Sequence, residues 1–350
     1  MSTHSVHLLH VQQADSNNPF SRPATPGYHA LQIGWCGLGA MGYLMARNLA
    51  KYRGTHSPGS PPLLVWNRTA SKSEQLQKEL GEDKIKIAQS PKDIALECDV
   101  VFTNLANDTV VKDIYEQFAN ALKVSPDSIN KNRIFVETST VYPSLAGELD
   151  TLISNIPHAT LVTCPLICVM AGDYRSKKEI AYLLVPAVGR KVMDLGGNLE
   201  KAPTFKLIGN SLILGSIELL AESFTLAEKA GIGAPLVQNF VKDMMPAPSM
   251  VNYGEKMLHD SFDGTKGFAL DGGLKDSTHI RRLATELDSP MPALHIHMLT
   301  ARAIHSAQMR RGEHGFDVLD WSSLVAGARV AAGLDGFDSS KHDAKVVLED

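Results

Sequence analysis

The stretch Ile33-Gly34-Trp35-Cys36-Gly37-Leu38-Gly39-Ala40-Met41-Gly42 predicts a short apolar strand that runs through a glycine turn into a helix. Gly37, Gly39 and Gly42 fill the pattern G-x-G-x-x-G. In this pattern the first glycine permits a tight turn, the second lets a pyrophosphate approach the backbone, and the third lets the helix pack on the strand. The phosphates would lie at the unpaired N–H groups of the helix N-terminus. The predicted contacts to such a dinucleotide are Gly37, Leu38, Gly39, Ala40 and Met41.

The length and composition of the chain suit a globular protein of two domains. It has 350 residues, of which 44% are hydrophobic and 21% are charged, and this length exceeds that of one average domain. The net charge of −4 comes without a basic block, so we expect no nucleic-acid partner. The cysteines show no metal-ligand spacing, which predicts reduced thiols in an intracellular protein. They are Cys36, Cys98, Cys164 and Cys168.

No uninterrupted apolar run approaches the roughly 18–20 residues that a membrane span needs. The longest candidate, residues 207–220, is interrupted by polar side chains, so we expect no membrane partner. Residues 1–28 are polar, and Arg22 is their only arginine or lysine. They predict a disordered lead-in and a cytoplasmic protein, with a mitochondrial transit peptide as the less favoured alternative.

Apolar runs alternate with helical patterns from residue 30 to residue 185. This alternation predicts an α/β, Rossmann-like, doubly wound and mostly parallel sheet, and it favours the nucleotide interpretation of the glycine turn over an ordinary turn. A first helix is expected from about residue 41 to 52, followed by a turn-rich insertion over 54–62. The expected strands are 30–35, 63–66, 85–87, 99–105, 134–137, 160–162 and 181–185.

The pattern changes after residue 202, where only helix and loop signals follow. Residues 205–229 contain no proline and are apolar on nearly every side, which predicts a helix buried in a large core or at a subunit interface. We therefore expect a homodimer that buries this helix. The predicted organisation is a lead-in (1–28), a nucleotide-binding domain (29–202), an all-helical C-terminal domain (203–335) and a polar tail (336–350).

The second predicted strand ends in Asn67-Arg68-Thr69, where nucleotide specificity is usually set. A carboxylate at this place would bind a ribose diol, and none is present. Arg68 offers a bidentate, charge-assisted contact to a 2′-phosphate. The sequence therefore predicts NADPH rather than NADH, and the alternative is that Arg68 is a solvated surface charge.

Lys206 lies at the start of the long apolar helix, four residues before Asn210, so both side chains share one helix face. A lysine beside so much apolar surface should have a lowered pKa, in the range useful for proton transfer. Asn210 could hold the lysine or a reacting oxygen by a hydrogen bond. The alternative is an ordinary lysine whose stem covers apolar surface. Metal binding is not expected, because His295 and His297 would face apart on a helix.

The run from Gly37 to Gly42, continued by Met45-Ala46-Arg47-Asn48-Leu49, resembles the fingerprint of the β-hydroxyacid dehydrogenase family. This family includes 3-hydroxyisobutyrate dehydrogenase and is related to 6-phosphogluconate dehydrogenase. The resemblance covers about residues 31–333. It implies nucleotide contacts from Asn67, Arg68, Thr69, Leu105, Ala106 and Thr140.

The same resemblance implies an active site. Ser139, within Glu137-Thr138-Ser139-Thr140-Val141-Tyr142-Pro143, would lie near the substrate. Lys206 and Asn210 fall on the family's catalytic lysine–asparagine pair. Lys275, followed by Asp276, would reach the nicotinamide end and the substrate.

One segment departs from the family pattern. Where the family has Ser-Gly-Gly to receive a substrate carboxylate, this chain has Ile167-Cys168-Val169. The substitution removes a hydroxyl and adds bulk, which favours an apolar or non-acidic carbonyl substrate.

These features predict an oxidoreductase that transfers a hydride between NADP(H) and a carbonyl or alcohol carbon, with Lys206 as general acid and base. One alternative is an imine reductase or reductive aminase, a related branch whose members generally lack a lysine at the position of Lys206. The other is an NADPH-binding scaffold that has lost the chemistry, which the presence of Lys206, Asn210 and Lys275 disfavours.

Overall fold

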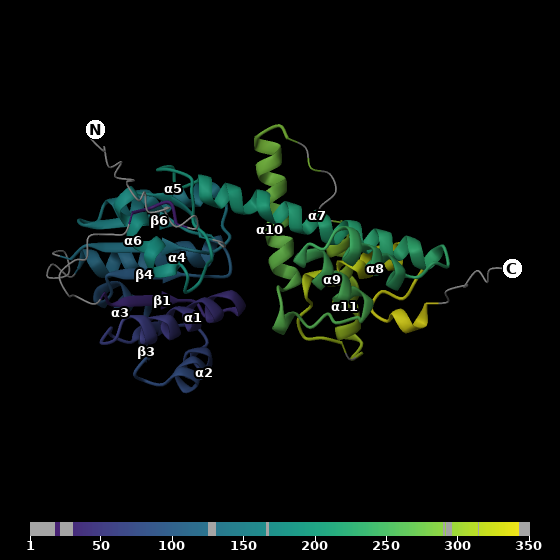
Figure 1. Cartoon of the computed structure of the whole chain (residues 1–350), viewed down its shortest axis with the longest axis horizontal. Helices are drawn as coiled ribbons and strands as arrows, with labels where there is room; N and C mark the ends of the chain where they lie inside the picture. Colours follow the sequence, from purple (N-terminus) through teal and green to yellow (C-terminus); the bar gives the residue numbers. More distant parts are fainter. Residues whose placement is uncertain are drawn as a thin grey trace, which may run out of the picture. The chain divides into compact units, whose positions relative to one another are not determined.

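The protein is described here from a computed structural model (Figure 1). The structure describes residues 18–21, 31–124, 131–165, 168–289, 291, 296–313 and 315–342. The chain divides into two compact units, residues 1–204 and residues 205–350. The predicted domain boundary, between residues 202 and 203, lies two residues from this division.

The first unit is built on an eight-stranded sheet in the order β3-β2-β1-β4-β5-β6-β7-β8. All neighbouring strands are parallel except β6 and β7. The predicted doubly wound, mostly parallel sheet is therefore confirmed. The strands are β1 (Ile33–Cys36), β2 (Leu63–Trp66), β3 (Ile85–Ile87), β4 (Val100–Thr103), β5 (Arg133–Glu137), β6 (Ala159–Thr163), β7 (Val169–Gly172) and β8 (Met193–Asp194).

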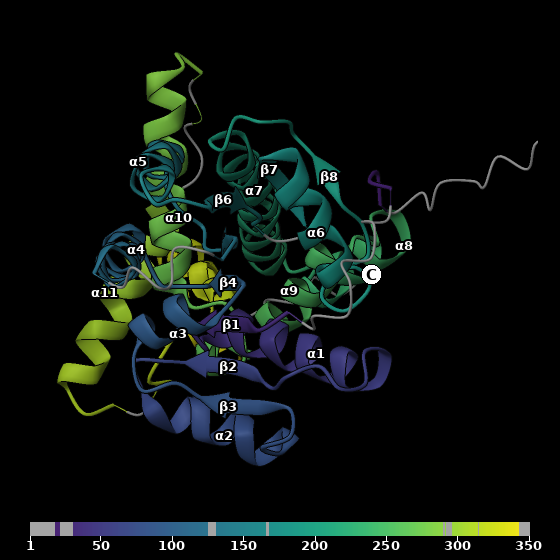
Figure 2. The same cartoon turned by 90° about the vertical axis from the view of Figure 1, so that its left-hand side faces the viewer.

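Helices cover both faces of this sheet (Figure 2). One core cluster joins the sheet to α1, α2 and α6 through residues such as Leu49, Leu76 and Ile180. The opposite cluster joins it to α3, α4 and α5. Successive strand residues face opposite sides, so Trp35 lies in the first cluster and Cys36 in the second. These helices are α1 (Ala40–His56), α2 (Ala70–Leu80), α3 (Pro91–Glu97), α4 (Asp108–Lys123), α5 (Pro143–Ser154) and α6 (Tyr174–Leu184).

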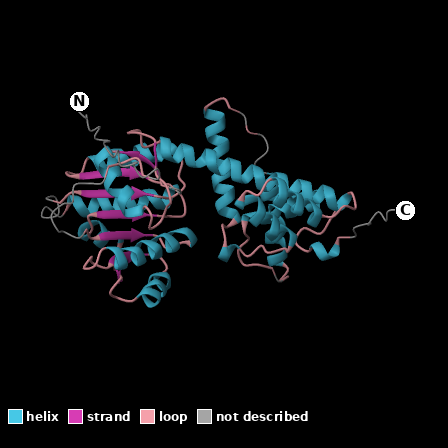
Figure 3. Cartoon of the chain, in the orientation of Figure 1, coloured by secondary structure: helices cyan, strands magenta, loops and turns pink. Residues whose placement is uncertain are grey.

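The second unit is helical, and the drawn strands lie in the first unit alone (Figure 3). Within the described residues, its extended pairing consists of two isolated bridges, Asp263 with Leu319 and Ala269 with Asp320. The expected helical C-terminal domain is confirmed. Its helices are α7 (Lys201–Lys229), α8 (Ala234–Met244), α9 (Pro248–Leu258), α10 (Leu270–Glu286), α11 (Ile296–Arg310) and α12 (Val325–Ala331).

The predicted strand 181–185 is wrong, because this segment forms the end of α6. The Asp173 side chain caps that helix by accepting a hydrogen bond from the Ser176 N–H at 2.8 Å. The apolar run that resembled a strand packs its Ile180 and Leu184 side chains into the core. Strands β7 and β8 were not predicted.

The first helix also runs further than predicted, to His56, so the start of the expected insertion is helical. Thr55 supports this last turn because its hydroxyl donates to the Tyr52 carbonyl at 3.0 Å. The His56 ring stacks on Tyr52, with the ring centroids 4.0 Å apart. Local side-chain contacts therefore outweigh the cost of Gly54 inside the helix.

The prediction of disorder over residues 1–28 is wrong for residues 18–21. Phe20 is 5% exposed and belongs to the core cluster shared with α6. Its ring packs edge-on against Tyr174, and its carbonyl accepts a hydrogen bond from the Tyr182 hydroxyl at 2.9 Å. The rest of this predicted lead-in lies outside the described residues.

The first half of the predicted polar tail also makes contacts. His342 Nδ1 lies 2.8 Å from a Glu228 carboxylate oxygen, and the Ser339 N–H donates to Asp260 at 2.8 Å. These bonds attach the tail to α7 and to the end of α9. Residues 343–350 of the tail lie outside the described residues.

Helix α7 is long and apolar enough to cross a membrane by length and composition alone. Half of its most apolar 18-residue stretch is buried inside the protein, and the core helix of a soluble protein can be equally long and apolar. Its Asn210 and Glu218 side chains bond to other helices, to Asp276 and His297. The expectation of no membrane partner stays a prediction.

Candidate active site

The glycine turn between β1 and α1 needs glycine at two places for steric reasons. Gly37 has φ +98°, and a Cβ there would lie 2.2 Å from the Asn104 carbonyl oxygen. A Cβ on Gly42 would lie 2.2 Å from the Gly37 carbonyl oxygen. At Gly39, by contrast, a Cβ would meet no protein atom within 4 Å. The backbone at Gly39 therefore faces open space, as a site for a pyrophosphate requires.

The N-terminus of α1 suits an anion. Gly39 is its N-cap, no side chain caps it, and its first turn holds no acidic residue. The N–H groups of this turn and the helix dipole therefore favour a phosphate. Ala40 and Met41 are exposed here. The Leu38 N–H, in contrast, donates to the Asn67 side chain at 2.8 Å. This bond fixes the backbone of Leu38, one of the predicted nucleotide contacts.

The end of β2 lies beside the glycine turn, because β1 and β2 are neighbours. Asn67 also donates from its amide to the Thr69 carbonyl at 3.0 Å, which fixes the turn that leads into α2. Arg68 is exposed. Across the described residues its guanidinium has no hydrogen-bond or ion-pair partner, so it is available to an anionic ligand.

Strands β4 and β5 bring the other predicted nucleotide residues to the same edge of the sheet. The Ser139 hydroxyl accepts a hydrogen bond from the Leu105 N–H at 2.7 Å. The Ser139 N–H donates to the buried Glu137 carboxylate at 2.6 Å, and the Thr103 hydroxyl donates to the same carboxylate at 2.7 Å. Carboxyl ends of parallel strands form the usual nucleotide crevice. The edge therefore carries the predicted residues Leu105, Ala106, Ser139 and Thr140.

Ser139 is 3% exposed. Its hydroxyl positions the loop after β4, a role that the prediction of a substrate contact did not include. Thr140 is half-buried beside it and has an interaction of its own.

The segment that departs from the family pattern is buried within the first unit, as far as it is described. Cys168 and Val169 are 4% and 2% exposed and lie in core clusters of this unit, whereas Ile167 lies outside the described residues. Cys168 has φ +55°, the left-handed conformation that favours glycine. The chain therefore keeps a glycine-like backbone at a position where the family has glycine. The predicted apolar pocket surface is wrong for Cys168 and Val169, because these side chains point into the core.

The second unit joins Lys206 and Asn210 to a buried acid. Lys206 Nζ donates to the Asn210 carbonyl oxygen at 2.9 Å, and the Asn210 amide donates to Asp276 Oδ2 at 2.6 Å. Lys275 Nζ lies 3.2 Å from Asp276 Oδ1. Asp276 is fully buried and Asn210 is 4% exposed. Helices α7 and α10 thus bring together the predicted residues Lys206, Asn210 and Lys275.

Burial and the charges within this cluster shift the pKa values of Lys206 and Asp276. Burial lowers the pKa of Lys206; Asp276 opposes this effect by attraction, and Lys275 adds to it by repulsion. Burial raises the pKa of Asp276, against the influence of Lys275, Lys206 and Asn210. A lysine with a lowered pKa beside a buried carboxylate is an arrangement suited to proton transfer.

Asp276 was not predicted as a site residue, although the resemblance places it beside Lys275. The available signal was its position in the sequence, because Asp276 lies among apolar residues such as Leu274 and Ile280, at a spacing that predicts a buried helix face. An acid among buried positions needs partners, and Asn210 and Lys275 supply them.

Comparison with known proteins matches residues 32–163 to the NAD binding domain of 6-phosphogluconate dehydrogenase. A relative is the NADH-dependent oxidoreductase ucdB of Aspergillus ustus, 24% identical over 84% of this chain and 98% of that protein. Rat mitochondrial 3-hydroxyisobutyrate dehydrogenase is 24% identical over 59% of each chain.

A similar solved structure is that of 3-hydroxyisobutyrate dehydrogenase from Salmonella typhimurium. It has a TM-score of 0.65 and 18% identity, and the alignment covers 84% of this chain and 99% of that chain. This likeness shows the fold. The matched region makes residues 32–163 an NAD-binding domain of the 6-phosphogluconate dehydrogenase type. With the curated relatives, it indicates an oxidoreductase that is similar to 3-hydroxyisobutyrate dehydrogenases over most of its length.

Proposed function

We propose that the protein transfers a hydride between NADP(H) and a carbonyl carbon, with Lys206 as the proton donor and acceptor. The observation that carries this proposal is the buried chain of hydrogen bonds from Lys206 through Asn210 to Asp276. A solvated surface lysine would need no such support. The nicotinamide, when bound, supplies or accepts the hydride.

Lys206, supported by Asn210 and Asp276 of the second unit, would transfer the proton. In reduction, the Lys206 ammonium donates a proton to the oxygen of the carbonyl as negative charge develops there. In oxidation, neutral Lys206 takes the proton from the hydroxyl. Asn210 holds the lysine amine through its carbonyl oxygen, and Asp276 orients Asn210 by accepting from its amide. General acid catalysis of this kind contributes about 10²–10⁴-fold to a rate.

The residues at the nucleotide edge support NADPH over NADH. Asn67 stands where a ribose-binding carboxylate would be, and its side chain is engaged with Leu38 and Thr69. Arg68 is exposed beside it and free to pair with a 2′-phosphate. The relative ucdB is named as NADH-dependent, so the proposal rests on the side chains of this chain.

We also propose that the active form is a homodimer that covers α7. The leucines and isoleucine along one side of α7 are 53–71% exposed in the single chain, which is costly for an isolated helix in water. Sedimentation of the full chain should give twice the mass of one chain, and a stable monomer contradicts the proposal. The residues are Ile208, Leu212, Leu219 and Leu226.

The proposed substrate class is a carbonyl compound without a carboxylate. This chain has Ile167 where the family has a serine, so it lacks the hydroxyl that would receive a substrate carboxylate. The alternative substrate is a cyclic imine, as in an imine reductase.

The test measures NADPH oxidation against semialdehyde acids, apolar aldehydes and ketones, and cyclic imines. We expect turnover of the apolar carbonyls, and a preference for the acids would overturn the substrate class. Turnover of imines alone, unchanged in Lys206→Ala, would favour the imine reductase. Tight NADPH binding without turnover of any compound would favour the scaffold.

A further inference from the structure

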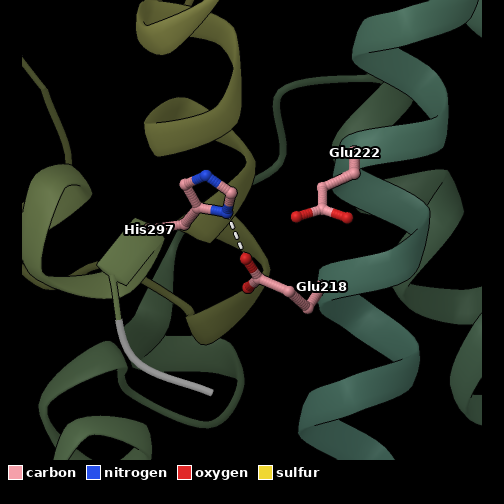
Figure 4. Close-up of side chains that lie close together, drawn as sticks. All are labelled: Glu218, Glu222 and His297. Atoms are coloured by element: carbon pink, nitrogen blue, oxygen red, sulfur yellow. Dashed lines mark hydrogen bonds and ion pairs between the residues drawn. The ribbon is translucent and has the colours of Figure 1, made fainter. Parts of the chain in front are cut away.

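Three side chains of the second unit meet between α7 and the start of α11 (Figure 4). Glu218 and Glu222 are four residues apart on α7, so they share one helix face. His297 approaches from α11, and its Nδ1 bonds to the Glu218 carboxylate. One ligand atom from each of the three residues lies within 4.8 Å of the other two.

The charges in this cluster do not balance without a cation. Glu218 is 8% exposed, and its carboxylate lies against the Nδ1 atom of His297. Glu222 is exposed, and among the described residues it has no hydrogen-bond or ion-pair partner. Two carboxylates therefore face one imidazole, which carries at most a single positive charge.

We propose that Glu218, Glu222 and His297 bind a divalent transition-metal ion of the zinc type. One imidazole nitrogen and two carboxylate oxygens are a common donor set for such an ion, whereas magnesium and calcium prefer oxygen ligands alone. Water would fill the remaining position on the exposed side of Glu222.

The present geometry can become that of a bound state through small side-chain movements. Ligand atoms around zinc lie about 3.4 Å apart, given bond lengths of about 2.0–2.2 Å. The ligand atoms of the cluster lie within 4.8 Å of one another, and the exposed Glu222 can adjust its distance to the other two by rotating its side chain. Glu218 and His297 now share a hydrogen bond, and they would exchange it for bonds to the ion by moving slightly apart.

The proposed metal is structural and separate from the reaction. Glu218 lies twelve residues after Lys206 on the same helix, which is about 18 Å along the axis. An ion held by both α7 and α11 would tie these helices together and stabilise the folded second unit. The proposal is therefore independent of the proposed hydride transfer.

The experiment uses untagged, full-length protein freed of metal by a chelator. Zinc binding is measured by equilibrium dialysis and calorimetry, and the coordination by the visible absorption of added cobalt. His4, His7 and His10 offer further nitrogens in the sequence, so the decisive quantity is the difference between the wild type and the variants. We expect Glu222→Gln to bind one zinc fewer per chain and to lose the cobalt spectrum.

Matched variants separate a metal site from a plain ion pair. Asp243→Asn removes an exposed carboxylate from α8 and should bind zinc like the wild type. Saturating zinc should raise the melting temperature of the wild type by about 5 °C and leave that of Glu222→Gln unchanged. Equal zinc stoichiometry and equal cobalt spectra in the wild type and Glu222→Gln would overturn the proposal. His297→Gln gives a second check, because it removes the nitrogen ligand and should also abolish the cobalt spectrum.

Discussion

The nucleotide edge of the first unit and the Lys206 cluster of the second unit are assembled in different ways. The edge consists of short segments that follow neighbouring parallel strands, and its working parts are backbone N–H groups and a few adjacent side chains. The cluster joins side chains 66 residues apart, on two packed helices. A contiguous motif therefore predicts the first site, whereas the second becomes complete only in three dimensions.

The two sites should also fail differently when they are altered. A substitution at the nucleotide edge acts either by filling space beside the backbone or by removing a single contact to the nucleotide. A change in the cluster acts through charge, because each of its members alters the pKa of another. The following predictions test this contrast.

The largest effect is expected for Lys206→Ala. Loss of the proton donor should lower the turnover of a reducible substrate by about 10²–10⁴-fold. NADPH affinity, measured by fluorescence titration, should stay within about twofold, since the predicted nucleotide contacts other than Lys275 belong to the first unit. Lys229→Ala, at the other end of α7, is the matched control and should keep the wild-type rate. A normal rate in Lys206→Ala would remove Lys206 from the mechanism.

The glycine turn offers a pair of variants with opposite consequences. Gly37→Ala forces an alanine to φ +98° and against the Asn104 carbonyl, so it should lower the free energy of unfolding by about 1–3 kcal/mol. Gly39→Ala meets no protein atom within 4 Å, so its stability should change by less than about 0.5 kcal/mol. It should nevertheless weaken NADPH binding, because the methyl group enters the space of the pyrophosphate. Urea denaturation and NADPH titration of both variants distinguish these effects, and equal stability losses would contradict the assignment.

Arg68→Ala tests which cofactor the edge selects. Loss of a charge-assisted hydrogen bond to a phosphate costs about 1.5–3 kcal/mol, so the KM for NADPH should rise about tenfold to a hundredfold. The KM for NADH should barely change, because NADH carries no 2′-phosphate. Lys72→Ala, an exposed residue of the neighbouring α2, is the control for a general loss of positive charge. Equal losses for both cofactors would refute the NADPH assignment.

Much of this architecture could be predicted from local patterns. The apolar runs indicated β1, β2, β4 and β5, because buried parallel strands have nearly continuous apolar sequences. The same rule failed at residues 181–185, since a short apolar run looks alike in a strand and on the buried side of a helix. A capping side chain, Asp173, decided the outcome there.

The side-chain sites show the same limit. The spacing of Lys206 and Asn210 placed them on one helix face, and the structure joins them at 2.9 Å. The spacing of His295 and His297 predicts that they do not pair along one helix, and this stays a prediction because His295 lies outside the described residues. The spacing could not show that Glu218 approaches His297 from α7. Contacts between distant helices leave no periodic signal in a sequence.

The smallest and most specific effect is a pair of opposite shifts in the pH profile of reduction. The rate should fall as the pH rises through the pKa of Lys206, because only the ammonium form donates a proton. Asp276 raises this pKa and Lys275 lowers it. Asp276→Asn should therefore move the fall in rate to lower pH, and Lys275→Gln should move it to higher pH. Substrate-saturated rates, measured from pH 6 to pH 10 at a saturating NADPH concentration, report the direction. Shifts of the same sign in both variants would mean that the profile reflects another group, whereas opposite shifts would tie it to the Lys206 amine.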